Sequence, residues 1–159
     1  WMATSNKNLS SGRPTNLKNP EAFRIGIVVS EWNEEVTEAL YSGAVSTLLQ
    51  AGVSKEKIER KDVPGSFELP LGAQWLATRE DIDAVICIGC IIQGETKHFD
   101  FICAACADGI TNVGLKYNKP VAFGVLTTDN MKQAMDRAGG KFGNKGDEAA
   151  STVLKMLNF

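Results

Sequence analysis

The sequence predicts an α/β fold, a single-domain three-layer α/β/α sandwich built on a four-stranded parallel sheet. The first observation is that short apolar runs alternate four times with segments of helical periodicity. This alternation favours parallel strands joined by helices that cover both faces of the sheet. The second is that 159 residues, 43% of them hydrophobic, suit one domain with one core. The third is that the chain shows neither an internal repeat nor a second domain.

Four short runs predict the strands of this sheet. They occupy residues 23–30, 57–64, 84–92 and 120–128. The run AVICIGCII at 84–92 is the most apolar, so it is expected at the centre of the sheet. The run KIERKDVP at 57–64 is less apolar and is expected at an edge.

A segment of helical periodicity follows each predicted strand. Asn33 is expected to cap the first helix, and Pro70 suits the first turn of the second. Thr128 or Asp129 is expected to cap the fourth helix, and Gly139 to stop it. The helices are expected at residues 34–51, 70–80, 96–117, 129–139 and 147–159.

Composition excludes several functional classes. The formal net charge is −2, and no basic stripe with interleaved aromatic residues occurs, so nucleic acid is not expected as a partner. No apolar stretch approaches the roughly 18 residues that a membrane span needs. The chain also begins without a signal-peptide pattern. The expected location is therefore the cytoplasm.

The first twenty residues differ from the rest of the chain. They are polar, rich in Ser, Asn and Lys, and include Pro14 and Pro20. This composition predicts a flexible N-terminal arm over residues 1–20. The folded domain is then expected to cover residues 21–159.

The four cysteines form two CxxC pairs, Cys87–Cys90 and Cys103–Cys106, a spacing that first suggests a zinc site. Cys87 and Cys90 lie in the central apolar run, and side chains three apart on a strand point to opposite faces. The second pair lies in an Ala-rich segment of helical character, where small thiols pack well. The sequence therefore favours reduced core cysteines and no metal.

In an open α/β sheet, ligands bind beyond the carboxyl ends of the strands. The turn after the first strand, SEWN, offers Trp32, which can stack on a flat heterocycle or be partly buried against a helix. The turn after the second, PGSFE, offers Ser66 and Glu68 on either side of Phe67. These two polar side chains can bond sugar-like hydroxyls or simply make the turn and cap a helix.

The turn after the third strand, IIQGETKH, contains the only histidine of the chain. Gly94 allows the backbone to approach a ligand, and Glu95 and Thr96 are expected to open a helix whose free amides attract phosphate. His98 falls in the same first turn. The positive helix end disfavours a charged imidazole there, so His98 could take or give a proton. The alternative is an exposed helix cap with an idle histidine.

A second group of candidate residues lies apart from these turns. Phe123 is near the beginning of the fourth strand, and Arg137 is expected where the following helix has run back to the same edge. Lys145 follows in the loop GGKFGNKG, which lacks the register of a nucleotide-triphosphate loop. If these residues serve the ligand of the first group, they come from a neighbouring subunit. The sequence therefore predicts a site shared across an interface.

Five segments carry a resemblance to a known family. They are RIGIVVSEWN, VPGSFELP, GCIIQGETKHFDFI, PVAFGVLTTDN and RAGGKFGNKGDEAA. Their order and spacing over about residues 23–157 resemble the 6,7-dimethyl-8-ribityllumazine synthase family. The resemblance implies a flavodoxin-like strand order and a transferase of riboflavin biosynthesis. The reaction would condense 5-amino-6-(D-ribitylamino)uracil with 3,4-dihydroxy-2-butanone 4-phosphate, without a metal or an organic cofactor.

The resemblance also implies roles for individual residues. Trp32 would stack on the pyrimidine, although phenylalanine is more usual there, and His98 would be the catalytic proton-transfer residue. The ribityl chain and ring would be bound by Ser66, Phe67 and Glu68, and the pyrimidine would be lined by Cys90, Ile91 and Ile92. Phosphate would be bound by Glu95, Thr96 and Arg137, with Glu95 where many members have alanine. The adjacent subunit would supply Phe123, Arg137 and Lys145, with Lys145 near the pyrimidine.

Assembly follows from the same resemblance. Members form homopentamers, and in some of them pentamers build a hollow 60-subunit shell, with riboflavin synthase as a candidate partner. Two other functions stay open on the sequence alone. One is a riboflavin synthase of the archaeal type, which shares the fold and would consume the lumazine. The other is a non-catalytic flavin- or lumazine-binding shell protein.

Overall fold

A computed structural model describes residues 7–12, 14 and 16–159 of the chain. Four strands form one parallel sheet in the order β2-β1-β3-β4. They are β1 (Ile25–Ser30), β2 (Ile58–Val63), β3 (Ala84–Ile92) and β4 (Val121–Thr128). The predicted fold class and flavodoxin-like order are confirmed. The apolar run at 84–92 is an inner strand, and the less apolar run lies at an edge, as expected.

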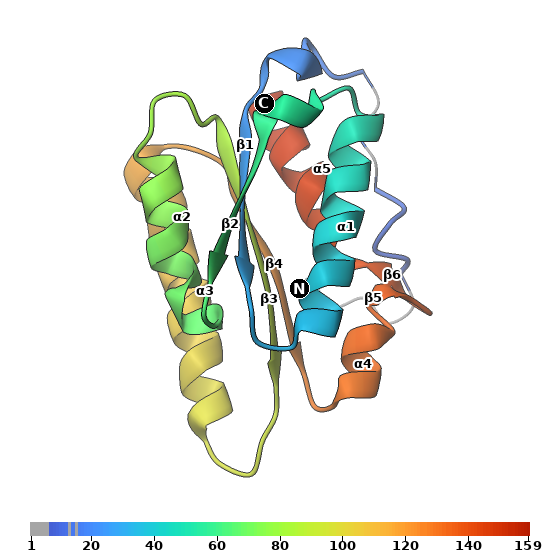
Figure 1. Cartoon of the computed structure of the whole chain (residues 1–159), viewed down its shortest axis with the longest axis vertical. Coiled ribbons are helices and arrows are strands. Elements are labelled where there is room, and N and C mark those ends of the chain that lie inside the picture. Colours follow the sequence, from blue (N-terminus) through green and yellow to red (C-terminus); the bar gives the residue numbers. More distant parts are fainter. Residues whose placement is uncertain (1–6, 13, 15) are drawn as a thin grey trace.

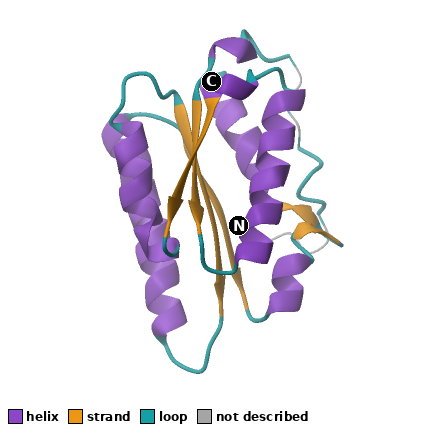
Figure 2. Ribbon diagram, viewed as in Figure 1, coloured by secondary structure: helices purple, strands orange, loops and turns teal. Residues whose placement is uncertain are grey.

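Helices cover both faces of this sheet. On one face lie α2 (Leu69–Ala77) and α3 (His98–Tyr117), and on the other lie α1 (Glu34–Gln50), α4 (Met131–Met135) and α5 (Lys145–Leu157) (Figures 1 and 2). A short antiparallel hairpin, β5 (Ala138–Gly140) with β6 (Gly143–Asn144), connects α4 to α5. Single 3-10 turns occur at Pro20–Ala22, Lys55–Lys57 and Ser66–Glu68. Within the described residues, no helix combines the length and apolarity that a bilayer crossing needs.

The sheet separates two apolar cores. Alternate residues of β3 face alternate sides, so Cys90 joins the core under α1 and α5, whereas Cys87 joins the core under α2 and α3. This is the geometry that argued against a shared metal. Burial raises the pKa of the Cys87 thiol, and it raises that of Cys106 to about 12. Both thiols are therefore protonated and act as small core side chains.

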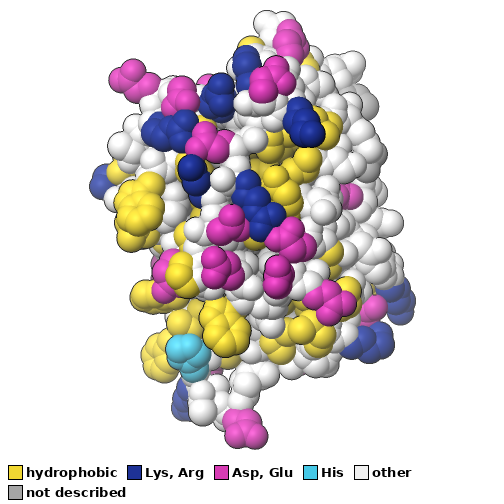
Figure 3. Space-filling model, in the orientation of Figure 1, with side chains coloured by type: hydrophobic (Ala, Val, Ile, Leu, Met, Phe, Trp, Pro, Cys, Tyr) yellow, Lys and Arg dark blue, Asp and Glu magenta, His cyan; other side chains and the backbone are white. Residues whose placement is uncertain are grey.

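The exposed edge of the sheet is protected by charge. On β2 and its neighbours, Arg60 pairs with Glu38 and Asp62, and Arg79 pairs with Glu59. Figure 3 shows acidic and basic side chains interleaved over this face of the molecule. An edge strand that presents so many charges resists pairing with the edges of other sheets.

The third helix begins two residues later than expected. The prediction placed its start at Thr96, but α3 starts at His98, and Lys97 occupies the N-cap position. The Thr96 hydroxyl oxygen accepts the backbone N–H of His98 at 3.4 Å, so Thr96 lies just outside the helix and helps to end the preceding bend. His98 is therefore the first residue of the helix.

The fourth helix differs more from its prediction. Its cap is Asn130, not Thr128 or Asp129, because the Asn130 side chain accepts the N–H of Gln133 at 2.9 Å. The helix ends at Met135, and Gly139, expected as its stop, lies in β5 with a left-handed φ of 104°. Arg137 therefore lies in the short connection between α4 and the hairpin.

Part of the predicted arm is described. The N–H of Leu9 donates to the carbonyl oxygen of Phe142 (2.8 Å), and the N–H of Lys18 donates to Asn158 Oδ1 (2.9 Å). The predicted boundary between an arm of residues 1–20 and a domain of residues 21–159 stays a prediction. Residues 1–6, 13 and 15 lie outside the described residues.

A substitution at Gly146 of α5 tests how closely α1 packs against α5. A Cβ at this position would overlap the carbonyl oxygen of Leu40 and lie 2.7 Å from its carbonyl carbon. We expect Gly146→Ala to lower the free energy of unfolding by about 2 kcal/mol or more, because neither helix backbone can move without disturbing the core. Urea denaturation measures this change.

The matched control is Gly114→Ala within α3. Its Cβ would meet nearby atoms only at ordinary contact distances of 3.4 Å and beyond. Stability there should stay unchanged or rise by up to about 1 kcal/mol, because alanine is the better helix former. Equal destabilisation by the two variants would contradict the packing argument.

Candidate active site

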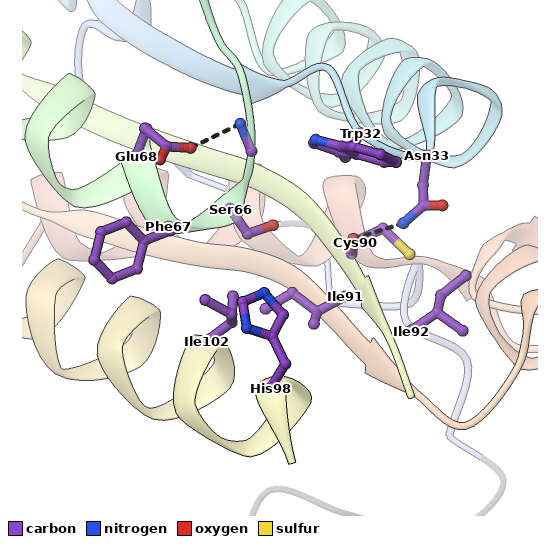
Figure 4. A pocket seen from close by; sticks show the side chains of 11 residues that line it. Trp32, Asn33, Ser66, Phe67, Glu68, Cys90, Ile91, Ile92, His98 and Ile102 are labelled. Carbon is purple, nitrogen blue, oxygen red and sulfur yellow. Dashed lines mark hydrogen bonds between the residues drawn. The ribbon is translucent and has the colours of Figure 1, made fainter. Parts of the chain in front are cut away.

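A cavity of about 650 Å³ opens at the carboxyl ends of the strands, a size suited to a small organic ligand. It brings together the three turns that the sequence singled out and the first turn of α3 (Figure 4). Its lining comprises Trp32, Asn33, Gly65, Ser66, Phe67, Glu68, Cys90, Ile91, Ile92, His98 and Ile102. Eight of the predicted site residues are among them.

The turn between β1 and α1 presents Trp32. The N–H of Trp32 donates to the Pro64 carbonyl oxygen (3.3 Å), which ties this turn to the end of β2. A Cβ on Gly65 would lie 3.3 Å from Trp32 Cδ1, so glycine there leaves room for the indole. The Trp32 side chain is 72% exposed. Its own chain does not bury the ring, which leaves a face free for stacking.

The turn between β2 and α2 orients Glu68. Its Oε2 accepts the N–H of Gly65 at 2.9 Å, closing the 3-10 turn Ser66–Glu68. This bond fixes the carboxylate and leaves further lone pairs for a ligand hydroxyl. Phe67, between Ser66 and Glu68, is 59% exposed and adds a second open ring to the rim of the cavity.

Ser66 contributes a buried hydroxyl to the cavity. Among the described residues, neither Ser66 Oγ nor the neighbouring Ser30 Oγ has a hydrogen-bond partner. A Cβ on Gly89 would lie 2.7 Å from Ser66 Oγ, so only glycine at that position of β3 admits the hydroxyl. A buried, unpaired hydroxyl costs about 1–3 kcal/mol. A ligand hydroxyl or a water that bonded Ser66 would recover that free energy.

Asn33 joins two of the turns. Its side-chain Nδ2 donates to the carbonyl oxygen of Cys90 at 2.9 Å, linking the start of α1 to the end of β3. The expectation of a side-chain helix cap was wrong, although Asn33 does occupy the N-cap position. Its φ of 60° lies in the left-handed region, which asparagine tolerates better than most residues. Burial raises the pKa of the Cys90 thiol to about 11, so this lining group is neutral.

His98 and Ile102 come from the first two turns of α3, four residues apart and hence on one face of the helix. Figure 4 shows the His98 imidazole directed into the cavity, near Ile91 and Ile102. Glu95 and Thr96 lie in the exposed segment before the helix and do not line the cavity. A Cβ on Gly94 would meet nothing within 4 Å, so this segment is open to a ligand.

Three predicted residues lie away from the cavity that the described residues form. Phe123 is half-buried against the core under α2 and α3, paired in register with Cys87. The Arg137 guanidinium lies 4.7 Å from the centre of the Phe142 ring and donates to the Gln133 carbonyl oxygen (3.0 Å).

Lys145 Nζ lies 2.6 Å from Glu148 Oε1. It belongs, like Arg137, to the side of the sheet that carries α1, α4 and α5. A single chain therefore does not bring Phe123, Arg137 or Lys145 to the cavity.

The geometric reason given for placing Arg137 at the opposite edge was wrong. The five residues of α4 rise only about 7.5 Å. The eight residues of β4 span about 26 Å. Arg137 therefore stays in the half of the sheet nearer the carboxyl ends, and what separates it from the cavity is the sheet itself.

Comparison with known proteins identifies the family. A family model described as 6,7-dimethyl-8-ribityllumazine synthase matches residues 22–159. The chain belongs to this lumazine synthase family. A lumazine synthase of Cytophaga hutchinsonii is 65% identical over 156 residues, covering 98% of each chain. One of Parabacteroides distasonis is 51% identical over 158 residues, covering 99% of each, and one of Flavobacterium johnsoniae is 52% identical, covering 98% of this chain and 82% of the relative.

Three cavity residues were not predicted as such from the sequence, namely Asn33, Gly65 and Ile102. Ile102 could have been found, because a residue four positions after His98 shares its helix face. Gly65 stands directly before the predicted turn residues, and its small size is what Trp32 requires. Asn33 was singled out for a different reason, and no local pattern indicates a bond to a residue 57 positions away.

Substitutions at Asn33 separate its hydrogen bond from its backbone conformation. Asn33→Gly removes the bond to Cys90 but accepts the left-handed φ, and should lower the free energy of unfolding by about 1 kcal/mol. Asn33→Ala also forces alanine into that region, and should cost about 2 kcal/mol or more. Chemical denaturation of both variants beside the wild type measures the two contributions. Equal stability of the two variants would mean that the backbone conformation is not a constraint.

Proposed function

We propose that this chain condenses 5-amino-6-(D-ribitylamino)uracil with 3,4-dihydroxy-2-butanone 4-phosphate to give 6,7-dimethyl-8-ribityllumazine, phosphate and water. The observation that carries the proposal is the cavity at the carboxyl ends of the strands. It combines two open aromatic rings with buried and fixed oxygen atoms and one histidine, in a chain that matches the lumazine synthase family over residues 22–159. The enzyme is thus a transferase of riboflavin biosynthesis.

The cavity suits the aminouracil on chemical grounds. A flat pyrimidine would stack on the exposed Trp32 indole, with Cys90, Ile91 and Ile92 along its edge. The ribityl hydroxyls would bond to the Ser66 hydroxyl and to the free lone pairs of Glu68. The Trp32 ring is open to solvent, and the Ser66 hydroxyl has no partner among the described residues. Binding would therefore complete contacts that the fold leaves unmade.

Phosphate would bind at the start of α3. The twenty residues of α3 give a long run of aligned peptide dipoles, and the segment before it is open. Thr96 would contribute its hydroxyl, and Glu95 only its backbone amide, because a carboxylate beside phosphate is repelled. A guanidinium from Arg137 of an adjacent subunit would complete the charge balance through paired hydrogen bonds.

The reaction consists of steps that move protons. The aryl amine attacks the ketone to form an imine with loss of one water, and phosphate then leaves. The remaining chain tautomerises, and a second amine closes the ring with loss of a second water. His98, directed into the cavity, can pass protons between these groups. Holding the two substrates together supplies further acceleration, since oriented pairs gain at most roughly 7–11 kcal/mol.

The site needs a second subunit on this account. One chain leaves Trp32 largely exposed and keeps Phe123, Arg137 and Lys145 away from its own cavity. We therefore assign these three residues to the cavity of an adjacent subunit in a homopentamer, whose pentamers can build a 60-subunit shell. A riboflavin synthase partner and a cytoplasmic location belong to the same proposal.

Replacing His98 tests the proton-transfer role. We expect His98→Ala to lower kcat about 10²-fold without abolishing turnover, because stacking and substrate alignment remain. The pH dependence of kcat should also flatten. Absorbance of the lumazine and release of phosphate, measured together, follow the reaction. Wild-type turnover across the pH range in the variant would remove His98 from the mechanism.

Replacing Arg137 tests the phosphate contact. We expect Arg137→Ala to raise KM for the phosphorylated substrate about 10- to 100-fold, since charge-assisted hydrogen bonds contribute about 1.5–3 kcal/mol. KM for the aminouracil should change little. Lys132→Ala, in the preceding helix α4 and paired with Asp136, is the matched control and should leave both KM values unchanged. A rise in both KM values for Arg137→Ala would contradict a phosphate-specific role.

Product analysis separates this function from the two alternatives. A synthase releases one phosphate for each lumazine formed when both substrates are mixed. Conversion of added lumazine to riboflavin would instead identify a riboflavin synthase. Ligand binding without phosphate release would identify a non-catalytic carrier.

A further inference from the structure

Residues Asn8–Ser10, from here on the docking segment, lie against the β5–β6 hairpin. The N–H of Leu9 donates to the Phe142 carbonyl oxygen at 2.8 Å. The Ser10 hydroxyl oxygen accepts the N–H of Asn144 at 3.1 Å. These bonds join residues more than 130 positions apart, and they engage the hairpin turn at Phe142 and the strand β6 at Asn144.

Gly143 makes this contact close. A Cβ there would overlap Asn8 Oδ1 and lie 3.0 Å from the backbone nitrogens of both Leu9 and Ser10. Its φ of 83° is also left-handed, so glycine is favoured on two counts. The docking segment therefore rests directly on the backbone of the turn.

The hairpin in turn fixes Arg137. Phe142 has its carbonyl oxygen bound by Leu9, its N–H bound to the Asp136 carbonyl oxygen at 2.7 Å, and its ring under the Arg137 guanidinium. A guanidinium held over a ring in this way gains about 0.5–1 kcal/mol at an exposed site. The position of Arg137 therefore depends on where Phe142 is held.

The same hairpin fixes Lys145. The N–H of Lys145 donates to the Arg137 carbonyl oxygen at 2.9 Å, so the two cationic residues are directly joined. Asn144, whose N–H is bound by Ser10, caps α5 by accepting the N–H of Gly146 at 2.7 Å. Its Nδ2 also donates to the Ala39 carbonyl oxygen at 3.0 Å. Ser10 thus accepts the backbone N–H of Asn144, the N-cap residue of α5, and Lys145 is the first residue of that helix.

We propose that the docking segment positions Arg137 and Lys145 for substrate binding, with Ser10 as its principal positioning residue. This rests on the proposed function, in which the two cations contact the substrates of an adjacent subunit. The segment is then a functional part of the enzyme, although its polar composition predicted a flexible arm. It touches no substrate and acts through the hairpin.

Kinetics of Ser10→Ala test the proposal. We expect KM for the phosphorylated substrate to rise about three- to tenfold, the loss that follows from one hydrogen bond. The kcat should stay within about twofold, because His98 and its turn are unaffected. Ser10→Thr, which keeps the hydroxyl acceptor, should restore the wild-type KM. Unchanged KM values in Ser10→Ala would overturn the proposal.

A double variant shows whether Ser10 acts through Arg137. In an Arg137→Ala background, Ser10→Ala should raise KM for the phosphorylated substrate by less than about twofold, because the group it positions is gone. An undiminished further rise would show that the segment acts by another route, and would overturn the proposed link.

Amide hydrogen exchange provides a readout that does not depend on activity. Exchange at the Asn144 and Lys145 amides should be faster in Ser10→Ala than in the wild type, and should return to the wild-type rate in Ser10→Thr. If exchange accelerates but KM does not change, the segment holds the hairpin without serving the site, and the proposal fails. If the wild-type enzyme forms no lumazine, the proposed function fails, whereas faster exchange would still establish the contact.

Discussion

Parallel pairing of β2, β1 and β3 in one register is the constraint on which the rest of the structure depends. Val29 of β1 lies opposite both Asp62 of β2 and Ile88 of β3. From this level β1 and β2 continue for one residue, and β3 continues to Ile92. Within four residues of that level, each strand leads to a residue that lines the cavity. These residues are Trp32 after β1, Ser66 after β2 and Cys90 on β3. A reversed or slipped strand would send its turn elsewhere, and no substitution within the turns could compensate.

The cavity is assembled at a cost in stability. It leaves the Trp32 and Phe67 rings open to solvent, keeps the Ser66 hydroxyl buried without a partner among the described residues, and holds Asn33 in a left-handed conformation. The unpaired hydroxyl and the left-handed Asn33 each oppose folding by an amount on the order of 1 kcal/mol, and the open rings forgo the stabilisation that burial would give. Such features concentrate at functional sites, where a ligand supplies the missing contacts. The buried apolar cores on both sides of the sheet offset this cost.

The sequence was sufficient for the sheet because three strands are short apolar runs, and the charged strand β2 lies, like them, between turn residues. Ligands bind beyond the carboxyl ends of the strands in such a sheet, and this rule placed eight site residues, from Trp32 to His98, in one cavity. Prediction from the sequence failed where contacts between residues distant in the sequence override the local helical pattern. DNMKQAMDRAG reads as one helix, but it is a five-residue helix followed by a hairpin, which Gly139, Gly143 and the docking segment stabilise. The short helix also explains why Arg137 was placed at the wrong edge, whereas its separation from the cavity was anticipated.

The central claim is that the cavity of one subunit is completed by residues of the next, and a mixing experiment tests it most directly. His98→Ala and Arg137→Ala subunits are unfolded, mixed in equal amounts and reassembled. If each site draws His98 from one subunit and Arg137 from its neighbour, about one quarter of the sites in a random assembly have both residues. The account predicts that, at a concentration of the phosphorylated substrate well below the wild-type KM, the mixture regains about that share of wild-type activity. Activity equal to the average of the two separately reassembled variants would show that each chain carries a complete site, and would contradict the account.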